Sequence, residues 1–264
     1  MSQRAARRRQ ERASRATQGR GGGFNPRVMA VATILVAAVL IVGVWYSTRG
    51  SRSEVDPDVA GSVLAGALTM GAEDAPVTVV EFGDYKCPGC RIFDQLIFPV
   101  LHEEYIEPGL VRFQFIHFPF LGPDSVTAAV AVKAVQQQDP EAAWNLHHAL
   151  FENQGSQNVQ WATRAYIAEL ARQVAPDIDH DKLAEDLTNR DISAAVRRES
   201  EYTRRMGVNA TPSLMVNGQL VDGPNYEDLR QAIDAALAEA GATQEEAPAD
   251  DAGDAGADAG AAED

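Results

Sequence analysis

The two cysteines of this 264-residue chain stand three positions apart, in the run Cys87-Pro88-Gly89-Cys90. An apolar stretch of strand character, 77–82, precedes them, and an amphipathic stretch of helical character, 91–98, follows. The pair is therefore expected at a strand-to-helix junction, where the free N–H groups and dipole of the helix N-terminus stabilise a thiolate at Cys87. Zinc also uses CxxC, but the sequence has no second CxxC or CxxH. Redox chemistry is thus favoured over a zinc site, and over an inert disulfide closing a small loop.

Residues 28–46 contain no charged side chain and consist mostly of Val, Ala, Leu and Ile. At about 1.5 Å per residue this run nearly matches a hydrocarbon core of about 30 Å, and it predicts a single-pass transmembrane signal-anchor. A cleaved signal peptide is the alternative, but its apolar stretch is usually about 7–15 residues long. The segment 1–27 holds eight Arg against one acid, so the positive-inside rule predicts a basic cytoplasmic arm and an extracytoplasmic domain.

The charge distribution excludes one class of function. The net charge is −15, yet the arm carries +7 and the last 24 residues carry −8, which leaves −14 for the residues between them. Nucleic-acid binding by that acidic part is not expected. The tail 241–264, rich in Ala, Gly, Asp and Glu, is predicted to be disordered.

The remaining segments predict an α/β domain over 68–240, joined to the anchor by a polar linker at 47–67. A second strand is expected at 110–118, a hairpin around Asn217-Gly218, and a last helix over 226–240. A helical block is expected at about 123–206, with segments at 125–138, 141–153, 160–174, 181–188 and 191–206. Strands interspersed with helices in this order favour a mixed central sheet flanked by helices.

Two motifs carry a resemblance to a known family. The run 81–90, Glu-Phe-Gly-Asp-Tyr-Lys-Cys-Pro-Gly-Cys, and the run 207–218, with Thr211-Pro212 before the hairpin, resemble the DsbA-like thiol-disulfide oxidoreductases. The resemblance covers roughly 68–240 and implies a thioredoxin-like fold with an inserted all-helical subdomain. Gly89 departs from the many DsbA-like oxidases that have His at this position.

The resemblance also implies roles for individual residues. Cys87 is the nucleophile, Cys90 the resolving thiol, and Glu81 a buried acid that helps transfer the proton of Cys90, unless it is a solvated carboxylate at the strand end. Thr211-Pro212 is implied to be a cis peptide facing the CxxC, so that Thr211 and Pro212, with Pro88 and Gly89, form the substrate-binding surface.

Four further side chains are candidates for a functional role. Lys86 either adds to the stabilisation of the Cys87 thiolate or, as an exposed side chain, contributes nothing. His147-His148 are expected to be one buried and one exposed residue of a helix, and His117 is expected to be structural, so no metal site is predicted.

The expected function is that of a membrane-tethered enzyme that introduces disulfides into reduced or unfolded exported proteins. Its redox group is the Cys87–Cys90 disulfide, and no cofactor is expected. The resemblance implies re-oxidation by a quinone-linked membrane oxidase of the DsbB or VKOR type. The alternatives are a disulfide isomerase or reductase, and a non-catalytic client-binding or copper-handling module. Isomerase relatives dimerise through a separate N-terminal domain, for which 47–67 is too short, so a monomer is expected.

Overall fold

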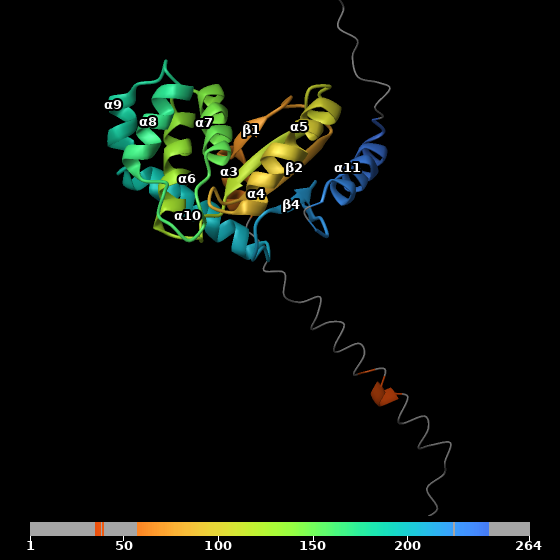
Figure 1. The fold of residues 1–264 in the computed structure, drawn as a ribbon. Coiled ribbons are helices and arrows are strands. Elements are labelled where there is room, and N and C mark those ends of the chain that lie inside the picture. The colour runs from red at the N-terminus through yellow and green to blue at the C-terminus, as the bar shows by residue number, and fades with distance from the viewer. Residues whose placement is uncertain (1–34, 38, 40–56, 224, 243–264) are drawn as a thin grey trace, which may run out of the picture. The chain divides into compact units, whose positions relative to one another are not determined.

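The structure, a computed structural model, describes residues 35–37, 39, 57–223 and 225–242. The chain divides into two units, Met1–Arg52 and Ser53–Asp264, and the second contains the sheet (Figure 1). Across the described ranges, no helix is both long and apolar enough to span a membrane. The predicted arm 1–27, most of the predicted anchor 28–46 and the tail beyond residue 242 lie outside the described residues.

A five-stranded mixed sheet forms the centre of the second unit, with the strand order β1-β3-β2-β4-β5. The central strand β2 pairs in parallel with β3 and antiparallel with β4, as expected for a mixed sheet. The strands are β1 (Leu68–Met70), β2 (Val77–Gly83), β3 (Val111–His117), β4 (Ser213–Val216) and β5 (Gln219–Leu220).

The two faces of β2 serve two different cores. Side chains alternate between faces along a strand, so Val77, Val79 and Glu81 share one face while Val80 and Phe82 share the other. Val77 and Val79 belong to the larger apolar core, which also contains Cys90. Val80 and Phe82 belong to a smaller core on the opposite face. The alternation therefore directs Glu81 to the face on which the cysteine-bearing helix packs.

The helical block is present, as predicted, between β3 and β4. Figure 1 shows its helices gathered on one side of the domain, with α11 on the opposite side. The block differs from the prediction mainly at its third helix, which begins at Arg164 and not near residue 160, because the Thr163 side chain caps it. Its members are α6 (Pro123–Gln136), α7 (Pro140–Glu152), α8 (Arg164–Val174), α9 (His180–Asp186) and α10 (Arg190–Arg205).

The end of the predicted linker 47–67 is helical, so the linker prediction is wrong there. Residues Pro57–Ala65 form α3, and Ala67 follows it directly before β1. Val63 and Ala67 are buried in the smaller core against Val80 and Phe82. These apolar side chains give the segment a packed face, which a tether would not have.

The helix after the cysteines is longer than the predicted 91–98 and contains two π-helical segments. It runs through α4 (Pro88–Ile92), η1 (Phe93–Ile97), α5 (Phe98–Leu101) and η2 (His102–Ile106), and the residues at each junction keep right-handed helical dihedral angles. Pro99 lies just after η1 and has no N–H to donate to the preceding turn, which favours a local π bulge.

The C-terminal elements agree closely with the prediction. Asn217 and Gly218 both have positive φ angles, 44° and 82°, which suits a two-residue hairpin between β4 and β5. The last helix, α11 (Tyr226–Ala240), is capped by the Asn225 side chain and ends at Gly241 in the left-handed conformation.

Candidate active site

The cysteine pair lies where the sequence predicts, at the junction between β2 and α4. Cys87 is the N-cap residue of α4 with extended dihedral angles, and Pro88 occupies the first helical position. Cys90 lies one turn into the helix and is fully buried, whereas Cys87 is 8% exposed. Both thiols are free in this structure. Only the outer sulfur is therefore positioned to meet another molecule.

The surroundings of Cys87 favour its thiolate. Its pKa is lowered to about 6, first by a hydrogen bond from the Cys90 side chain, against the opposing effect of burial. Thr211 and the backbone N–H groups of Cys90 and Gly89 add smaller contributions. Most Cys87 side chains are therefore ionised at neutral pH, and the thiolate is the nucleophilic form of cysteine.

The surroundings of Cys90 and Glu81 favour the protonated forms of these two side chains. Burial raises the pKa of Cys90, and the Cys87 hydrogen bond and the nearby Glu81 raise it further. Burial also raises the pKa of Glu81, with Asp94 and Cys87 adding to the effect. Glu81 is 2% exposed, and its Oε1 has no hydrogen-bond partner among the described residues. The alternative of a solvated carboxylate at this position is therefore wrong.

Thr211 and Pro212 lie directly against the cysteine pair. Their peptide bond is cis, as the resemblance implies. The Cys87 thiol donates a hydrogen bond to the Thr211 carbonyl oxygen across 3.1 Å. A Cβ atom on Gly89 would lie only 2.9 Å from Pro212 Cδ, so a residue without a side chain suits this approach. Of the four residues predicted to contact substrate, Thr211 thus contacts the Cys87 sulfur, Gly89 lies against Pro212, and Pro88, next to Cys87 in the chain, is exposed.

Lys86 is buried, so its interpretation as an exposed side chain that contributes nothing is wrong. It is 3% exposed, and its Nζ donates to Asp124 Oδ1 of α6 across 2.8 Å. Burial opposes ionisation of Asp124, but the hydrogen bond from Lys86 lowers the pKa of that carboxyl overall. Lys86 therefore joins the loop before Cys87 to the helical insertion. The sequence could suggest this partner only through an Asp in the first turn of α6.

Two more polar side chains, both unanticipated, fix the same loop. Gln154 Nε2 donates to the carbonyl oxygens of Tyr85 and Cys87, at 2.8 and 3.0 Å. The Asp84 carboxylate accepts from the backbone N–H groups of Lys86, Phe120 and Leu121. These bonds hold the loop against the chain that follows β3 and against the insertion, so the position of Cys87 depends on both parts of the domain.

The histidines lie as predicted, with His147 buried and the His148 side chain 37% exposed. The Tyr85 hydroxyl lies 3.0 Å from His147 Nδ1 and 3.4 Å from His117 Nε2. His117 Nδ1 in turn lies 2.7 Å from a carboxylate oxygen of Glu199, which also pairs with Lys133. His117 is structural, as expected, and links β3 to α10.

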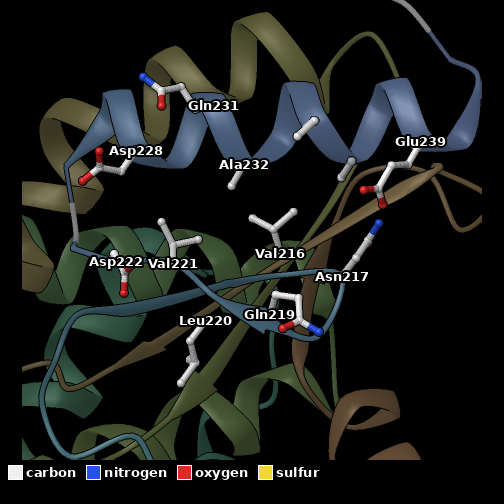
Figure 2. A pocket seen from close by; sticks show the side chains of 12 residues that line it. Val216, Asn217, Gln219, Leu220, Val221, Asp222, Asp228, Gln231, Ala232 and Glu239 are labelled. Atoms are coloured by element: carbon white, nitrogen blue, oxygen red, sulfur yellow. The ribbon is translucent and has the colours of Figure 1, made fainter.

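A groove of about 490 Å³ lies between the β4–β5 hairpin and α11 (Figure 2). Val216, Val221 and Ala232 lie in it, and Asp222, Asp228 and Glu239 supply acidic groups. Neither cysteine lines it. The reactive sulfur thus lies at the N-terminus of α4 and not in this groove. A position outside the groove is compatible with a substrate as large as another polypeptide.

Comparisons with known proteins agree with this geometry. A family model described as Thioredoxin matches residues 64–235. "Probable disulfide bond formation protein D" of Bacillus anthracis is 34% identical over 213 residues, which cover 80% of this chain and 97% of that protein. "Disulfide bond formation protein D" of Bacillus subtilis (strain 168) is 35% identical over 175 residues, covering 66% and 78%.

A solved structure has a similar fold. The crystal structure of oxidised BdbD from Bacillus subtilis matches with a TM-score of 0.63 and 35% identity, covering 66% of this chain and 95% of that one. The fold, the cysteine pair and the relatives together show that the chain belongs to the thioredoxin family and is a DsbA-like thiol-disulfide oxidoreductase.

Proposed function

We propose that the protein is a membrane-tethered, extracytoplasmic oxidase that introduces disulfides into exported proteins through a Cys87–Cys90 disulfide. The observation that carries this proposal is the asymmetry of the two thiols. The pKa of Cys87, which is 8% exposed, is lowered to about 6, and the pKa of the fully buried Cys90 is raised. A stabilised Cys87 thiolate favours the reduced form of the protein, which makes its disulfide a stronger oxidant.

The reaction proceeds by two thiol–disulfide exchanges. A client thiolate attacks Cys87 Sγ, the Cys87–Cys90 bond breaks, and a client–Cys87 mixed disulfide forms. Cys90 leaves as a thiolate and takes a proton from Glu81, whose pKa is raised by burial and by the nearby Asp94. A second client thiolate then attacks the client sulfur of the mixed disulfide, and Cys87 leaves as a thiolate. The client loses two electrons, and the protein gains them.

The surroundings of Cys87 supply the client-binding surface. In the reduced protein the Thr211 carbonyl accepts from Cys87 Sγ when this sulfur is protonated. When Cys87 is bonded to another sulfur this carbonyl is free to accept from a client backbone N–H, in the manner of an added strand. Pro88, Gly89 and Pro212 provide the flanking contacts without a charged side chain. Such a surface would accept many sequences, as a general oxidase requires.

The proposed partner for re-oxidation is a quinone-linked membrane oxidase of the DsbB or VKOR type. The apolar run 28–46 would anchor the chain in the cell membrane, and the eight Arg of 1–27 would keep the N-terminus in the cytoplasm. Tethering both proteins to one membrane raises their effective concentration. The protein would act as a monomer, and the redox-active disulfide serves in place of a cofactor. The names of the Bacillus relatives support a role in disulfide formation.

The decisive experiment uses the full chain in detergent micelles with its disulfide formed. It is mixed with a reduced, unfolded client that has two cysteines, and free thiols are counted over time. We expect two client thiols to disappear for each protein disulfide consumed. Cys87→Ser and Cys90→Ser should be inactive, and the surface variant Lys182→Met should match the wild type. Failure of the oxidised protein to act on the client would refute the oxidase proposal. Faster repair of a scrambled client than oxidation of a reduced one would favour an isomerase.

The location is tested separately in cells. A membrane-impermeant thiol reagent should label Cys87 of the reduced protein on intact cells. It should not label Ser2→Cys in a chain that lacks both native cysteines, because residue 2 belongs to the basic arm. Labelling of both positions, or of neither, would contradict the proposed orientation.

A further inference from the structure

A cluster of three potential metal ligands lies beside the cysteine-bearing helix. Asp94 belongs to the π segment η1, four residues after Cys90, and His147 and His148 belong to α7 of the insertion. Asp94 Oδ1 lies 2.6 Å from His148 Nδ1 and 3.4 Å from His147 Nε2. The three ligand atoms all lie within 4.8 Å of one another. Asp94 and His147 are 8% and 2% exposed, so this is a built site and not a surface cluster.

Hydrogen bonds behind the cluster fix the orientation of its buried imidazole. When His117 carries one proton, its Nδ1 donates to Glu199 and its Nε2 accepts from the Tyr85 hydroxyl. In the His147 tautomer that carries its proton on Nδ1, this nitrogen donates to the Tyr85 oxygen. This order leaves a lone pair on His147 Nε2 facing the Asp94 carboxylate. Two acceptors facing each other require a proton or a cation between them.

The cluster is accessible from solvent. A surface cavity of about 390 Å³ is lined by Met70, Asp94, Phe98, Pro99, His102 and His148. It reaches two of the three ligand residues, so an ion can enter without unfolding of the domain. The cavity also has room for a water molecule as a fourth ligand.

We propose that Asp94, His147 and His148 form a binding site for a divalent transition-metal ion of the zinc class. Two imidazoles and one carboxylate with an open fourth position are a ligand set that zinc uses. Zinc–ligand bonds of about 2.0–2.1 Å in tetrahedral geometry place ligand atoms about 3.4 Å apart. The His147–Asp94 separation already has this value. The shorter His148–Asp94 contact opens by rotation of the half-exposed His148 side chain.

An ion here would join the helix that carries Cys90 to the helical insertion. Asp94 comes from the first of these parts and the histidines from the second. The ion would therefore stabilise the packing between the two parts and raise the melting temperature in proportion to its binding. It would also place positive charge near Glu81, whose pKa already responds to Asp94.

The test is zinc titration of the chelator-treated full chain in detergent micelles, with the Cys87–Cys90 disulfide formed so that no thiolate competes. Calorimetry is expected to show one high-affinity zinc ion per chain, and thermal denaturation a higher melting temperature with zinc. His148→Gln changes a half-exposed residue and should weaken zinc binding at least ten-fold. The matched control His180→Gln, on α9 of the same insertion, should bind as the wild type does. Both variants keep the acidic tail, so weak binding there cancels in the comparison.

A second measurement uses the wild type first, so its main result does not depend on the folding of a variant. Cobalt, a spectroscopic substitute for zinc, should give visible absorption from nitrogen and oxygen ligands on the oxidised wild type, and Asp94→Asn should lose it. Absence of micromolar zinc binding by the wild type would overturn the proposal. Equal zinc affinity of wild type and His148→Gln would also overturn it. Activity as an oxidase enters neither readout, so failure here leaves the proposed function standing.

Discussion

The Cys87 thiol donates a hydrogen bond to the backbone carbonyl oxygen of Thr211 across 3.1 Å, although the two residues are 124 positions apart. This contact joins the helix that follows β2 to the segment that precedes β4, and β2 and β4 are paired strands. The reactive sulfur is therefore positioned by the pairing of β2 with β4 as well as by its own helix.

The first prediction concerns the reactivity of Cys87. In the reduced protein, alkylation by iodoacetamide should be half-maximal near pH 6, because only the thiolate reacts and its pKa is about 6. In Cys90→Ala the largest stabilising hydrogen bond is lost, so the midpoint should move toward the free-thiol value of about 8.5. A wild-type midpoint near 8.5 would contradict the proposed chemistry.

The same pKa makes a prediction about stability. The pKa of Cys87 is lower in the folded chain than its ordinary value of 9.0, so the folded state binds fewer protons there. The resulting stabilisation should be complete above pH 9 and disappear as the pH falls through about 6. Urea unfolding of the reduced wild type and of Cys87→Ser, compared between pH 5 and 9, measures it. A difference in unfolding free energy that does not vary with pH would refute the prediction.

Glu81→Gln should separate stability from catalysis. Burial raises the pKa of Glu81, so its ionisation costs stability increasingly as the pH rises above 4.5. Replacing a buried, incompletely bonded carboxylate by a neutral amide should raise the free energy of unfolding at pH 8 by about 1–3 kcal/mol. Because the amide cannot supply a proton to Cys90, formation of the client–Cys87 mixed disulfide should slow by about 100-fold.

Urea denaturation and stopped-flow mixing with a reduced client measure the two effects of Glu81→Gln. Unchanged rates of mixed-disulfide formation would show that Glu81 does not act as the proton donor. A lower free energy of unfolding at pH 8 would show that the Glu81 carboxylate makes a stabilising interaction that the amide cannot replace.

Lys86→Met tests the link between the active-site loop and the insertion. The substitution leaves the buried Asp124 carboxylate without its cation, which should cost about 3–5 kcal/mol of unfolding free energy. The matched control is Lys182→Met, since Lys182 is 48% exposed and pairs with Asp186 on the same helix. That change should cost far less than Lys86→Met, because solvent screens an exposed ion pair. Equal losses in the two variants, measured by urea denaturation, would mean that burial of the Lys86 pair is unimportant.

The sequence predicted best what local chemistry determines. The cysteine spacing placed Cys87 at a helix N-terminus, and Asn217-Gly218 located the hairpin, because each signal lies within a few residues of its consequence. The cis peptide and the burial of Glu81 came from the family resemblance, since neither follows from propensity. The predicted anchor and orientation remain predictions, because almost all of 28–46 lies outside the described residues.

What the sequence missed depends on partners far along the chain. Lys86 pairs with Asp124 at a separation of 38 residues, and Asp94 contacts His148 at a separation of 54. Such pairs leave no local pattern in the sequence, so the burial of Lys86 cannot be predicted from its neighbours in the chain. Helix α3 was missed because Val63 is the buried residue of the helix and Ala67, also buried, follows it, so few apolar side chains mark this polar segment.

The placement of β4 beside β2 also has a consequence for the newly made chain. Thr211 is synthesised 124 residues after Cys87. At about 5–20 residues per second, the cysteine pair exists for roughly 6–25 seconds before its opposing segment has been made. During that interval the two thiols lack the contacts that distinguish them in the folded protein. The hydrogen bond of Thr211 that helps to set the reactivity of Cys87 therefore forms only after the chain has been synthesised as far as β4.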